Sequence, residues 1–374
     1  MSIALNKVQT RFLRQYAQRL TPRQPGESAA QVVKDVCGIQ AQDARAAALS
    51  IRSRGAGLVA ADIEQARVQD RSIARAWGPR GTLHLLASED LGWLLMLFGP
   101  VFIAGDRARR LELGLDDETS ARGVREIRDI LADQGPLTRD ELVEQLAARG
   151  LRLEGQARPH LIFYAALQGI LCLGPDRGSK PTYVLLDDWL GHIDSTTLSR
   201  EAACAELARR YISAYGPASR DDMAAWSGLP ISEIRAAWKH IANSLLEVEI
   251  AGQPAWMLKS HLARLDEFSV DHPIVHLLAA FDTYLLGYRS RDMLVEQQYA
   301  KRINAGGGMI RPALLVDGRA AGTWQYSPKR KRLDVLVVPF EPLASAVLSG
   351  MEEEVGDVAR FLEIEATALT ILSE

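Results

Sequence analysis

Apolar and polar positions alternate with helical spacing through the middle of the chain, and one order of elements occurs twice. Segments 135–142 (GPLTRDEL) and 216–223 (GPASRDDM) share the pattern Gly-Pro-x-Ser/Thr-Arg-Asp-acidic-apolar. Gly-Pro ends one helix, the hydroxyl side chain caps the next, and acidic residues in a first turn suit the helix dipole. The pattern therefore predicts helix starts at Thr138 and Ser219.

The elements around the two copies follow the same order, which indicates an internal repeat. Each copy has a helix before the motif, two helices after it and a hairpin made of two apolar runs around a polar turn. The helices are predicted at 124–132, 139–148 and 159–167, and at 202–211, 220–227 and 231–245. The hairpins are predicted at 170–173 with 183–186, and at 246–250 with 255–258. Three helices followed by such a wing make a winged helix-turn-helix.

The two ends of the chain show related but weaker patterns. The first part could hold a third, more divergent copy, with helices at 7–19, 29–37, 43–54 and 62–67 and a hairpin at 72–77 with 82–86. After residue 270 the pattern becomes β-rich, with an Asp-Gly hairpin in 314–324, a basic turn at 327–332, a strand at 333–338 and a final helix at 342–360.

These patterns predict a mainly α protein with small β elements. We expect three tandem winged helix-turn-helix motifs followed by a C-terminal β-rich element. The expected domains are a first winged helix at 1–95, a second at 115–192, a third at 197–262 and the C-terminal element at 270–374.

Length and composition fit a folded chain of several domains. The chain has 374 residues, of which 47% are hydrophobic, so each domain can bury a core of its own. The first residues lack a signal-peptide pattern, and we expect no stretch of about 18 apolar residues elsewhere. This predicts a soluble, cytoplasmic protein. Cys37, Cys172 and Cys204 lie far apart, which predicts buried thiols rather than disulfides or a zinc site.

The formal net charge of −3 argues against a basic nucleic-acid-binding domain. The basic residues are mostly arginine, however, whose planar guanidinium suits phosphates and base edges. A genome rich in GC codons would also explain this excess of arginine. The location of the charges along the chain therefore has to distinguish DNA binding from codon bias. Basic residues gather in three places. The first is the turn 329–332, which follows Trp324 and Tyr326 and precedes the next predicted strand. The other two are one predicted helix and the region of the first hairpin. The latter two groups are Arg45, Arg52 and Arg54, and Arg71, Arg75 and Arg80.

Acidic residues gather elsewhere, at 116–118 and 352–354. This separation allows a basic face on an acidic molecule.

Two glutamines lie two positions apart just before a predicted helix. In an extended segment, residues at this spacing project from the same face. Asp43 is suited to cap the helix that follows, which would leave Gln40 and Gln42 extended with converging amides. The alternative is that these amides only satisfy backbone groups.

Four ordered segments of this chain resemble the winged-helix DNA glycosylases of the AlkZ type. They are the QAQ triplet before an Ala/Arg-rich helix, WGPRGTLHLL (77–86), FDTYLLGYRSRD (281–292) and GGGMIRPALLVDG (306–318). The resemblance extends over nearly the whole chain. Gln40-Ala41-Gln42 is similar to the Gln-apolar-Gln motif of the subgroup that unhooks interstrand crosslinks in azinomycin self-resistance. Housekeeping relatives carry Gln-aromatic-Asp instead.

The resemblance implies a monofunctional DNA glycosylase, a hydrolase of N-glycosyl bonds in base excision repair. Its substrates would be N7-alkylated purines and interstrand crosslinks, with Gln40 and Gln42 as catalytic residues. Amides do not titrate, but an N7-alkylated guanine leaves as a neutral base, so orienting a water could suffice. Asp43 and His84 are candidate supporting residues, with helix capping and core packing as their alternatives.

DNA contacts are expected from basic side chains on several segments, namely Arg45, Arg80, Arg289, Arg291, Arg311, Lys329, Arg330, Lys331 and Arg332. The expected partner is double-stranded DNA with alkylated or crosslinked guanine, bound by a monomer at the bacterial nucleoid. We expect no metal, no cofactor and no membrane. A non-catalytic winged-helix transcriptional regulator is the alternative, and a structural scaffold is a third.

Overall fold

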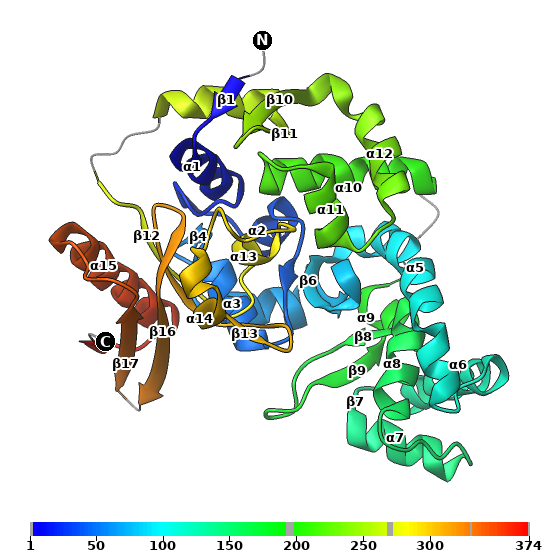
Figure 1. Cartoon of the computed structure of the whole chain (residues 1–374). Coiled ribbons are helices and arrows are strands. Elements are labelled where there is room, and N and C mark those ends of the chain that lie inside the picture. The colour runs from blue at the N-terminus through cyan, green and yellow to red at the C-terminus, as the bar shows by residue number, and fades with distance from the viewer. Residues whose placement is uncertain (1–2, 192–197, 268–271, 330, 373–374) are drawn as a thin grey trace. The chain divides into compact units, whose positions relative to one another are not determined.

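The computed structural model describes residues 3–191, 198–267, 272–329 and 331–372 (Figure 1). It contains two compact units. The first combines Met1–Ile63 with Ala205–Glu374, and the second is Glu64–Cys204. Helices predominate and the strands form small sheets, which confirms the predicted fold class. The four-domain division of the sequence remains a prediction.

The described part of the second unit is built from helices and a set of short antiparallel strands. Its helices are α5 (Leu91–Glu112), α6 (Asp117–Gln134), α7 (Arg139–Ala148), α8 (Ala157–Leu167) and α9 (Leu186–Leu190). Its strands are β5 (Ile73–Trp77), β6 (Leu83–Ala87), β7 (Leu137–Thr138), β8 (Leu171–Leu173) and β9 (Thr182–Leu185). They lie in the order β6-β5-β8-β9-β7. Ile127, Ile130, Leu142 and Leu161 are fully buried at the centre.

Helix α5 is the main element of this unit that the sequence analysis missed. It packs against α8, where Gly99 approaches so closely that an added Cβ would lie 2.5 Å from the carbonyl oxygen of Leu167. By length and hydropathy Ser88–Glu112 could cross a membrane, which corrects the expectation that no such stretch exists. A packed core helix passes the same test, so this segment is weak evidence for a membrane.

The predicted repeat is confirmed in its local structure. Thr138 and Ser219 each form a capping box, with Glu141 and Asp222 respectively. The residue just before each cap pairs with the second strand of the hairpin that follows, Leu137 with Tyr183 and Ala218 with Trp256. The first copy therefore adds a short third strand, β7, to its wing, and the second copy has an isolated β-bridge at the corresponding position.

The second copy and the N-terminal helices contribute to the first unit. Helix α10 (Arg200–Tyr215) begins before the boundary between the units and ends within the first. The other helices and strands of the copy are α11 (Arg220–Ser227), α12 (Ile231–His240), β10 (Leu245–Ile250) and β11 (Gln253–Leu258). Helix α12 is shorter than predicted, because a 3₁₀ turn, Ala242–Ser244, replaces its last turn. The N-terminal helices are α1 (Lys7–Ala17), α2 (Ala29–Asp35) and α3 (Ala44–Arg52), with α4 (Ala60–Glu64) at the boundary.

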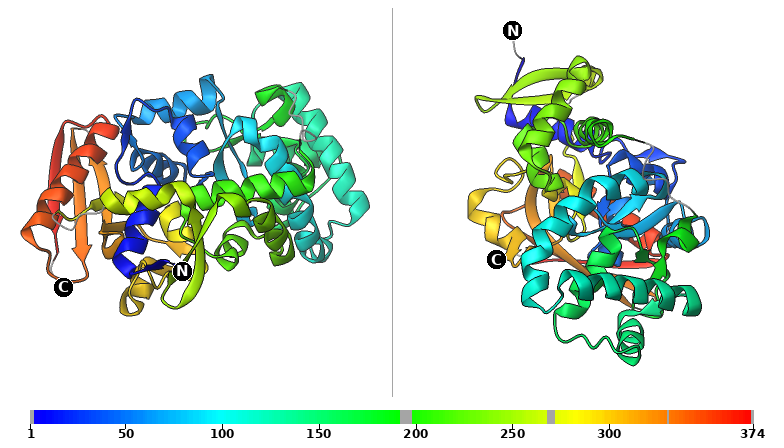
Figure 2. Two further views of the ribbon diagram at one scale, coloured as in Figure 1. Left: turned by 90° about the horizontal axis from the view of Figure 1, so that it is seen from above. Right: turned by 90° about the vertical axis from the view of Figure 1, so that its right-hand side faces the viewer.

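The C-terminal part of the first unit is a sheet with the order β12-β15-β16-β17-β18. Its strands are β12 (Val275–Leu278), β15 (Ala313–Val316), β16 (Arg319–Lys329), β17 (Arg332–Pro339) and β18 (Ala366–Ile371), the last of which was not predicted. The predicted Asp317-Gly318 turn joins β15 to β16. Helix α15 (Ser345–Phe361) packs against β12 and β18 (Figure 2).

The remaining elements of the first unit are short. They are β1 (Ile3–Leu5), β2 (Gln24–Pro25), β3 (Ile39–Gln40), β4 (Gly55–Ala56), α13 (Thr283–Leu286), α14 (Ala300–Ile303), β13 (Asn304–Gly306) and β14 (Met309–Ile310). β1 extends the β10–β11 hairpin as a parallel strand, so the N-terminus adds to the second copy of the repeat.

A fully buried ion pair holds α3 against the segment before α13. Arg54 Nη2 lies 2.7 Å from Asp282 Oδ1, and both side chains are 0% exposed. Ser50 donates to Asp282 and accepts from Arg54, and Thr283 accepts from Arg54. Burial alone would raise the pKa of Asp282, but the charge and hydrogen bonds of Arg54 outweigh it and lower the pKa.

A second buried arginine joins α3 to the last helix. Arg52 Nη2 lies 3.2 Å from Glu354 Oε2, and its Nη1 lies 2.8 Å from Asp357 Oδ2. The expected basic face formed by Arg45, Arg52 and Arg54 is therefore wrong for two of its three members. Their charges are used inside the fold, and Glu354, expected among remote compensating acids, is one of the partners.

We expect Asp282→Ala to lower the free energy of unfolding by about 3 to 5 kcal/mol, because it leaves the buried guanidinium of Arg54 unpaired. Urea denaturation followed by circular dichroism measures the change. Asp117→Ala is the matched control, since Asp117 pairs with Arg107 at the surface, where both side chains are more than half exposed. This control should change stability by less than about 1 kcal/mol. Equal effects of the two substitutions on the free energy of unfolding would contradict the stabilising role of the buried Arg54–Asp282 pair.

Candidate active site and DNA interface

The two candidate catalytic glutamines lie in the non-helical segment between α2 and α3. Backbone bonds from Cys37 N to Lys34 O and from Gly38 N to Val33 O end α2, and both residues have positive φ, 58° and 96°. The chain then extends through β3 to Gln40, which is 8% exposed. Ala41 is fully buried and Gln42 is exposed. The predicted extended conformation is present as a strand only up to Gln40, because the chain bends at Gln42, and convergence of the two amides remains a prediction.

Asp43 caps α3, as the sequence indicated. Its Oδ1 accepts hydrogen bonds from the backbone N–H of Arg45 at 2.8 Å and of Ala46 at 3.0 Å. The geometry thus favours the capping role over that of a general base.

Tyr326 on β16 lies beside the start of α3. Burial raises the pKa of its phenol, Asp43 raises it further and Arg45 lowers it, so all three side chains are close together. The Tyr326 ring stacks on Trp324 at 5.6 Å, and Trp324 donates a 2.7 Å hydrogen bond to Leu278 O. The sequence placed Tyr326 next to the basic turn, but nothing in the sequence indicated that it meets the segment after the glutamines.

The basic turn between β16 and β17 begins three residues beyond Tyr326. Lys329 and Arg332 are 58% and 53% exposed, and both contact the carboxylate of Asp334. Hydrogen bonds from Lys329 and then from Arg332 lower the pKa of Asp334, so it stays ionised. Lys331 is exposed, and Arg330 lies outside the described residues. The turn is therefore less positive than its sequence indicates.

The three arginines from the family-like C-terminal segments have different surroundings. Arg289 is 71% exposed and pairs with Asp221 at 3.1 Å. Arg291 is half-buried and its Nε donates a 2.7 Å bond to Leu285 O, and burial lowers its pKa. Arg311 is exposed, with a long 3.5 Å contact to Arg302 O. The structure thus gives Arg291 a structural bond, and leaves Arg289 and Arg311 at the surface.

The FDTYLLGYRSRD segment is largely internal. Asp282 and Thr283 bond to Arg54, Tyr284 donates its hydroxyl proton to Gly318 O, and Tyr288 donates to Tyr215 O. An added Cβ on Gly318 would lie 2.7 Å from the Tyr284 hydroxyl, which explains the glycine of the GGGMIRPALLVDG segment. These motif residues hold the first unit together.

Arg80 and His84 belong to the second unit. Arg80 is partly exposed in the β5–β6 turn with a left-handed backbone, φ 57°. His84 is 2% exposed and its Nδ1 lies 2.9 Å from Thr82 O. Burial, with a smaller contribution from Arg80, lowers the pKa of His84 to about 3. The ring is therefore neutral near pH 7, which favours its alternative role as a core residue.

The neighbouring arginines of the first hairpin are also engaged. Arg75 is 7% exposed, and Arg71 lies over the Trp189 ring and donates to Trp189 O at 2.9 Å. The basic group expected from Arg71, Arg75 and Arg80 is thus largely used within the second unit. Across the described ranges, no three His, Cys, Asp or Glu side chains gather as metal ligands would.

Comparison with known proteins gives a consistent result. A family model described as "DNA glycosylase AlkZ-like" matches residues 33–361. The chain belongs to the AlkZ-like DNA glycosylase family. It is 31% identical over 359 residues to the "Interstrand DNA cross-link repair glycosylase" of Streptomyces sahachiroi, covering 93% of this chain and 94% of that protein.

The solved structure of "Streptomyces sahachiroi DNA glycosylase AlkZ" superimposes on this AlkZ-like protein with a TM-score of 0.84. It has 26% sequence identity and covers 99% of this chain and 100% of that chain. Membership of a glycosylase family makes DNA the partner of this AlkZ-like protein. The resemblance seen in four segments of the sequence is confirmed, because the matches extend across them.

The buried neutral state of His84 predicts a pH dependence of stability. Its folded-state pKa of about 3 is below the ordinary 6.5, so its contribution to the free energy of unfolding is complete above about pH 6.5 and is lost as the pH falls toward 3. Between pH 7.5 and 4.5, wild type should lose about 2 kcal/mol more than His84→Asn, which cannot titrate. Urea denaturation at both pH values measures this difference, and parallel losses would rule out the buried neutral ring.

Proposed function

We propose that this AlkZ-like protein hydrolyses the N-glycosidic bond of N7-alkylated purines in duplex DNA and thereby unhooks interstrand crosslinks. The observation that carries the proposal is the Gln40-Ala41-Gln42 segment at the start of α3, whose neighbouring carboxylate is occupied as a helix cap. The crosslink substrate is supported by the printed name of the Streptomyces sahachiroi relative. We propose azinomycin-type crosslinks as the substrate, because Gln40-Ala41-Gln42 is similar to the Gln-apolar-Gln motif of the subgroup that acts in azinomycin self-resistance.

The chemistry suits a substrate that is already charged. An N7-alkylated purine carries a positive charge, so cleavage releases a neutral base and requires no proton from the enzyme. Amide side chains neither donate nor accept a proton near neutral pH, but they can hold a water by its hydrogens and its lone pairs. Orientation and preorganised dipoles then supply the rate enhancement. Unmodified bases, which leave as anions, should be poor substrates.

The DNA interface proposed here uses exposed cations of the first unit. Arg45 at the first turn of α3, Arg289, Arg311 and the β16–β17 turn are surface groups that phosphates can reach. Arg80 of the second unit is a further candidate. Because Asp334 neutralises part of the turn and the chain has no net positive charge, undamaged DNA should bind weakly and with strong salt dependence.

We also propose that the enzyme is monofunctional, acts as a monomer and works at the bacterial nucleoid. A lyase step needs an amine next to the reacting sugar, and the Gln40–Gln42 segment carries none. The product should therefore be an intact abasic strand.

Gln40→Ala and Gln42→Ala should each lower the rate of 7-methylguanine release from a methylated duplex by about 100-fold or more, because each removes a preorganised dipole. Affinity for the same duplex, measured by fluorescence anisotropy, should stay within a few-fold. Gln134→Ala is the matched control, since Gln134 is an exposed glutamine at the end of α6 that donates a 3.0 Å hydrogen bond to Gln145. Its rate should equal that of wild type.

The outcomes of this experiment are distinct. Undiminished release by both variants would refute the roles of the glutamines. No release by wild type from any N7-alkylated duplex would refute the proposed reaction and favour the DNA-binding regulator.

The β16–β17 turn gives a second test of the interface. Replacing Lys329, Lys331 and Arg332 by Ala should weaken DNA binding and reduce the slope of log affinity against log salt by about 0.9 for each lost phosphate contact. Asp334→Asn should have the opposite effect, because it releases Lys329 and Arg332 from their carboxylate partner. If both variants bind like wild type at every salt concentration, the turn faces away from DNA.

A further inference from the structure

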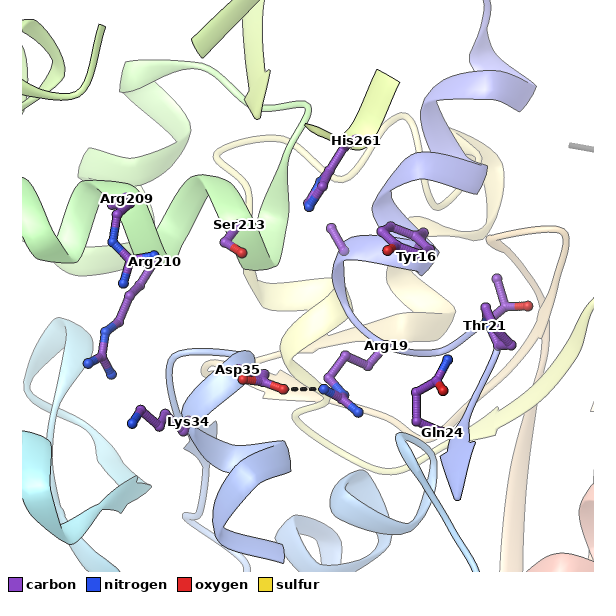
Figure 3. A pocket seen from close by; sticks show the side chains of 12 residues that line it. Tyr16, Arg19, Thr21, Gln24, Lys34, Asp35, Arg209, Arg210, Ser213 and His261 are labelled. Atoms are coloured by element: carbon purple, nitrogen blue, oxygen red, sulfur yellow. Dashed lines mark hydrogen bonds and ion pairs between the residues drawn. The ribbon is translucent and has the colours of Figure 1, made fainter. Parts of the chain in front are cut away.

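A cavity of about 360 Å³ lies within the first unit, apart from the residues given a role above (Figure 3). Its walls come from α1, α2, α10 and the 3₁₀ helix Lys259–Glu267. The described lining includes four cationic side chains and a single carboxylate, that of Asp35. Such a lining favours an anionic ligand.

One side of the cavity is cationic. Arg209 and Arg210 from α10 and Lys34 from α2 lie on this side, as Figure 3 shows. Both arginines bond to Glu206, Arg209 Nη2 at 2.6 Å and Arg210 Nε at 2.7 Å. This shared carboxylate holds the two guanidinium groups side by side. The side chain of Arg209 is 51% exposed, so a ligand can reach its guanidinium group.

The carboxylate that lines the cavity is itself neutralised. Asp35 forms an ion pair with Arg19, drawn as a dashed line in Figure 3, and accepts a 2.7 Å bond from Gln31 Nε2. Arg19 also pairs with Glu27. Asp35 therefore contributes little repulsion toward an anion. Glu206 likewise offsets part of the charge of Arg209 and Arg210, so Lys34 and the exposed guanidinium of Arg209 contribute most to the attraction of an anion.

The other side of the cavity is aromatic. Tyr16 and His261 meet edge to face, with their ring centroids 5.4 Å apart. Burial, and then the charge of Arg264, lowers the pKa of His261, so its ring is neutral near pH 7. In Figure 3, His261 points into the cavity from above and Ser213 lies between it and the arginines. Aromatic rings and a hydroxyl suit a sugar or base rather than a second phosphate.

We propose that this cavity binds a nucleotide through its phosphate. Lys34, Arg209 and Arg210 bind the phosphate oxygens, and Tyr16 and His261 contact the sugar and base. A volume of about 360 Å³ exceeds the needs of inorganic phosphate alone and falls in the range of small-ligand sites. The nucleotide is either free or part of a DNA strand, and the second case rests on the proposed function.

The backbone connection between α2 and the glutamine segment supports a DNA strand as one source of the bound phosphate. Helix α2, which carries Lys34, leads directly through the Cys37-Gly38 turn to Gln40. The intervening backbone spans at most roughly 20 Å, which corresponds to about six nucleotides of one strand or fewer. A phosphate bound at Lys34 would thus belong to the strand near the glutamines.

The test uses the full chain with two double variants that remove equal charge. Lys34→Gln with Arg209→Gln removes two cations of the cavity and leaves Arg210 paired with Glu206. Lys7→Gln with Arg107→Gln is the matched control, since Lys7 is exposed at the far end of α1 from Tyr16 and Arg107 is 57% exposed on α5. Circular dichroism and thermal unfolding confirm that both variants fold.

The first arm measures dGMP binding by isothermal titration calorimetry, with deoxyguanosine as the ligand that lacks the phosphate. A free nucleotide is the ligand if wild type and the control variant bind dGMP and the cavity variant binds it at least about tenfold more weakly. Deoxyguanosine should then bind at least about tenfold more weakly than dGMP to wild type.

The second arm measures affinity for undamaged duplex DNA over a series of salt concentrations. A strand phosphate is the ligand if the salt slope falls by about one or two in the cavity variant and by less in the control. The proposal is overturned if wild type does not bind dGMP and the two variants give equal slopes. Base release by wild type is measured separately, so a failure of the proposed glycosylase reaction does not affect the first arm.

Discussion

The buried ion pair between Arg54 and Asp282 is the constraint on which the first unit depends. Two opposite charges without access to water need further hydrogen bonds around them, and Gln18, Ser50 and Thr283 supply most of these, while the Nε of Arg54 has no partner among the described residues. Since these groups come from distant parts of the chain, only one arrangement of the helices satisfies them all. Helix α3 is held by this pair just beyond its last turn and presents the glutamine segment at its first.

The use of arginine inside the fold changes the meaning of the composition. Arg52 and Arg54 are fully buried, and Arg14 lies over the Tyr288 ring and donates to Pro217 O, so part of the arginine excess serves packing and ion pairing. Many cations remain exposed, and several of them are matched by local carboxylates, as in the pairs Arg107–Asp117, Arg177–Glu141 and Lys329–Asp334. A DNA glycosylase built in this way depends on contacts to the damaged site more than on general attraction to phosphates.

The candidate active site combines an extended strand end with a capped helix. Asp43 satisfies the first N–H groups of α3, which places its carboxylate in a structural role and leaves the amides on either side of Ala41 as the polar groups of the segment. Tyr326 lies close enough to Asp43 and Arg45 for their charges to shift the pKa of its phenol. It is at this segment that we propose a reaction without proton transfer to the leaving group.

The sequence by itself determined the features that depend on neighbouring residues. These features follow from contacts within about four positions of the chain. They are the caps at Asp43, Thr138 and Ser219, the end of each preceding helix and the Asp317-Gly318 turn. The four family segments could be identified for the same reason. Only the tertiary structure decided that Arg52 and Arg54 face inward, that Tyr326 meets Asp43 and that α1, α2 and α10 enclose a cationic cavity. Each of these depends on partners far away in the chain, and the charge of a side chain does not reveal whether its partner is water, a phosphate or a buried carboxylate.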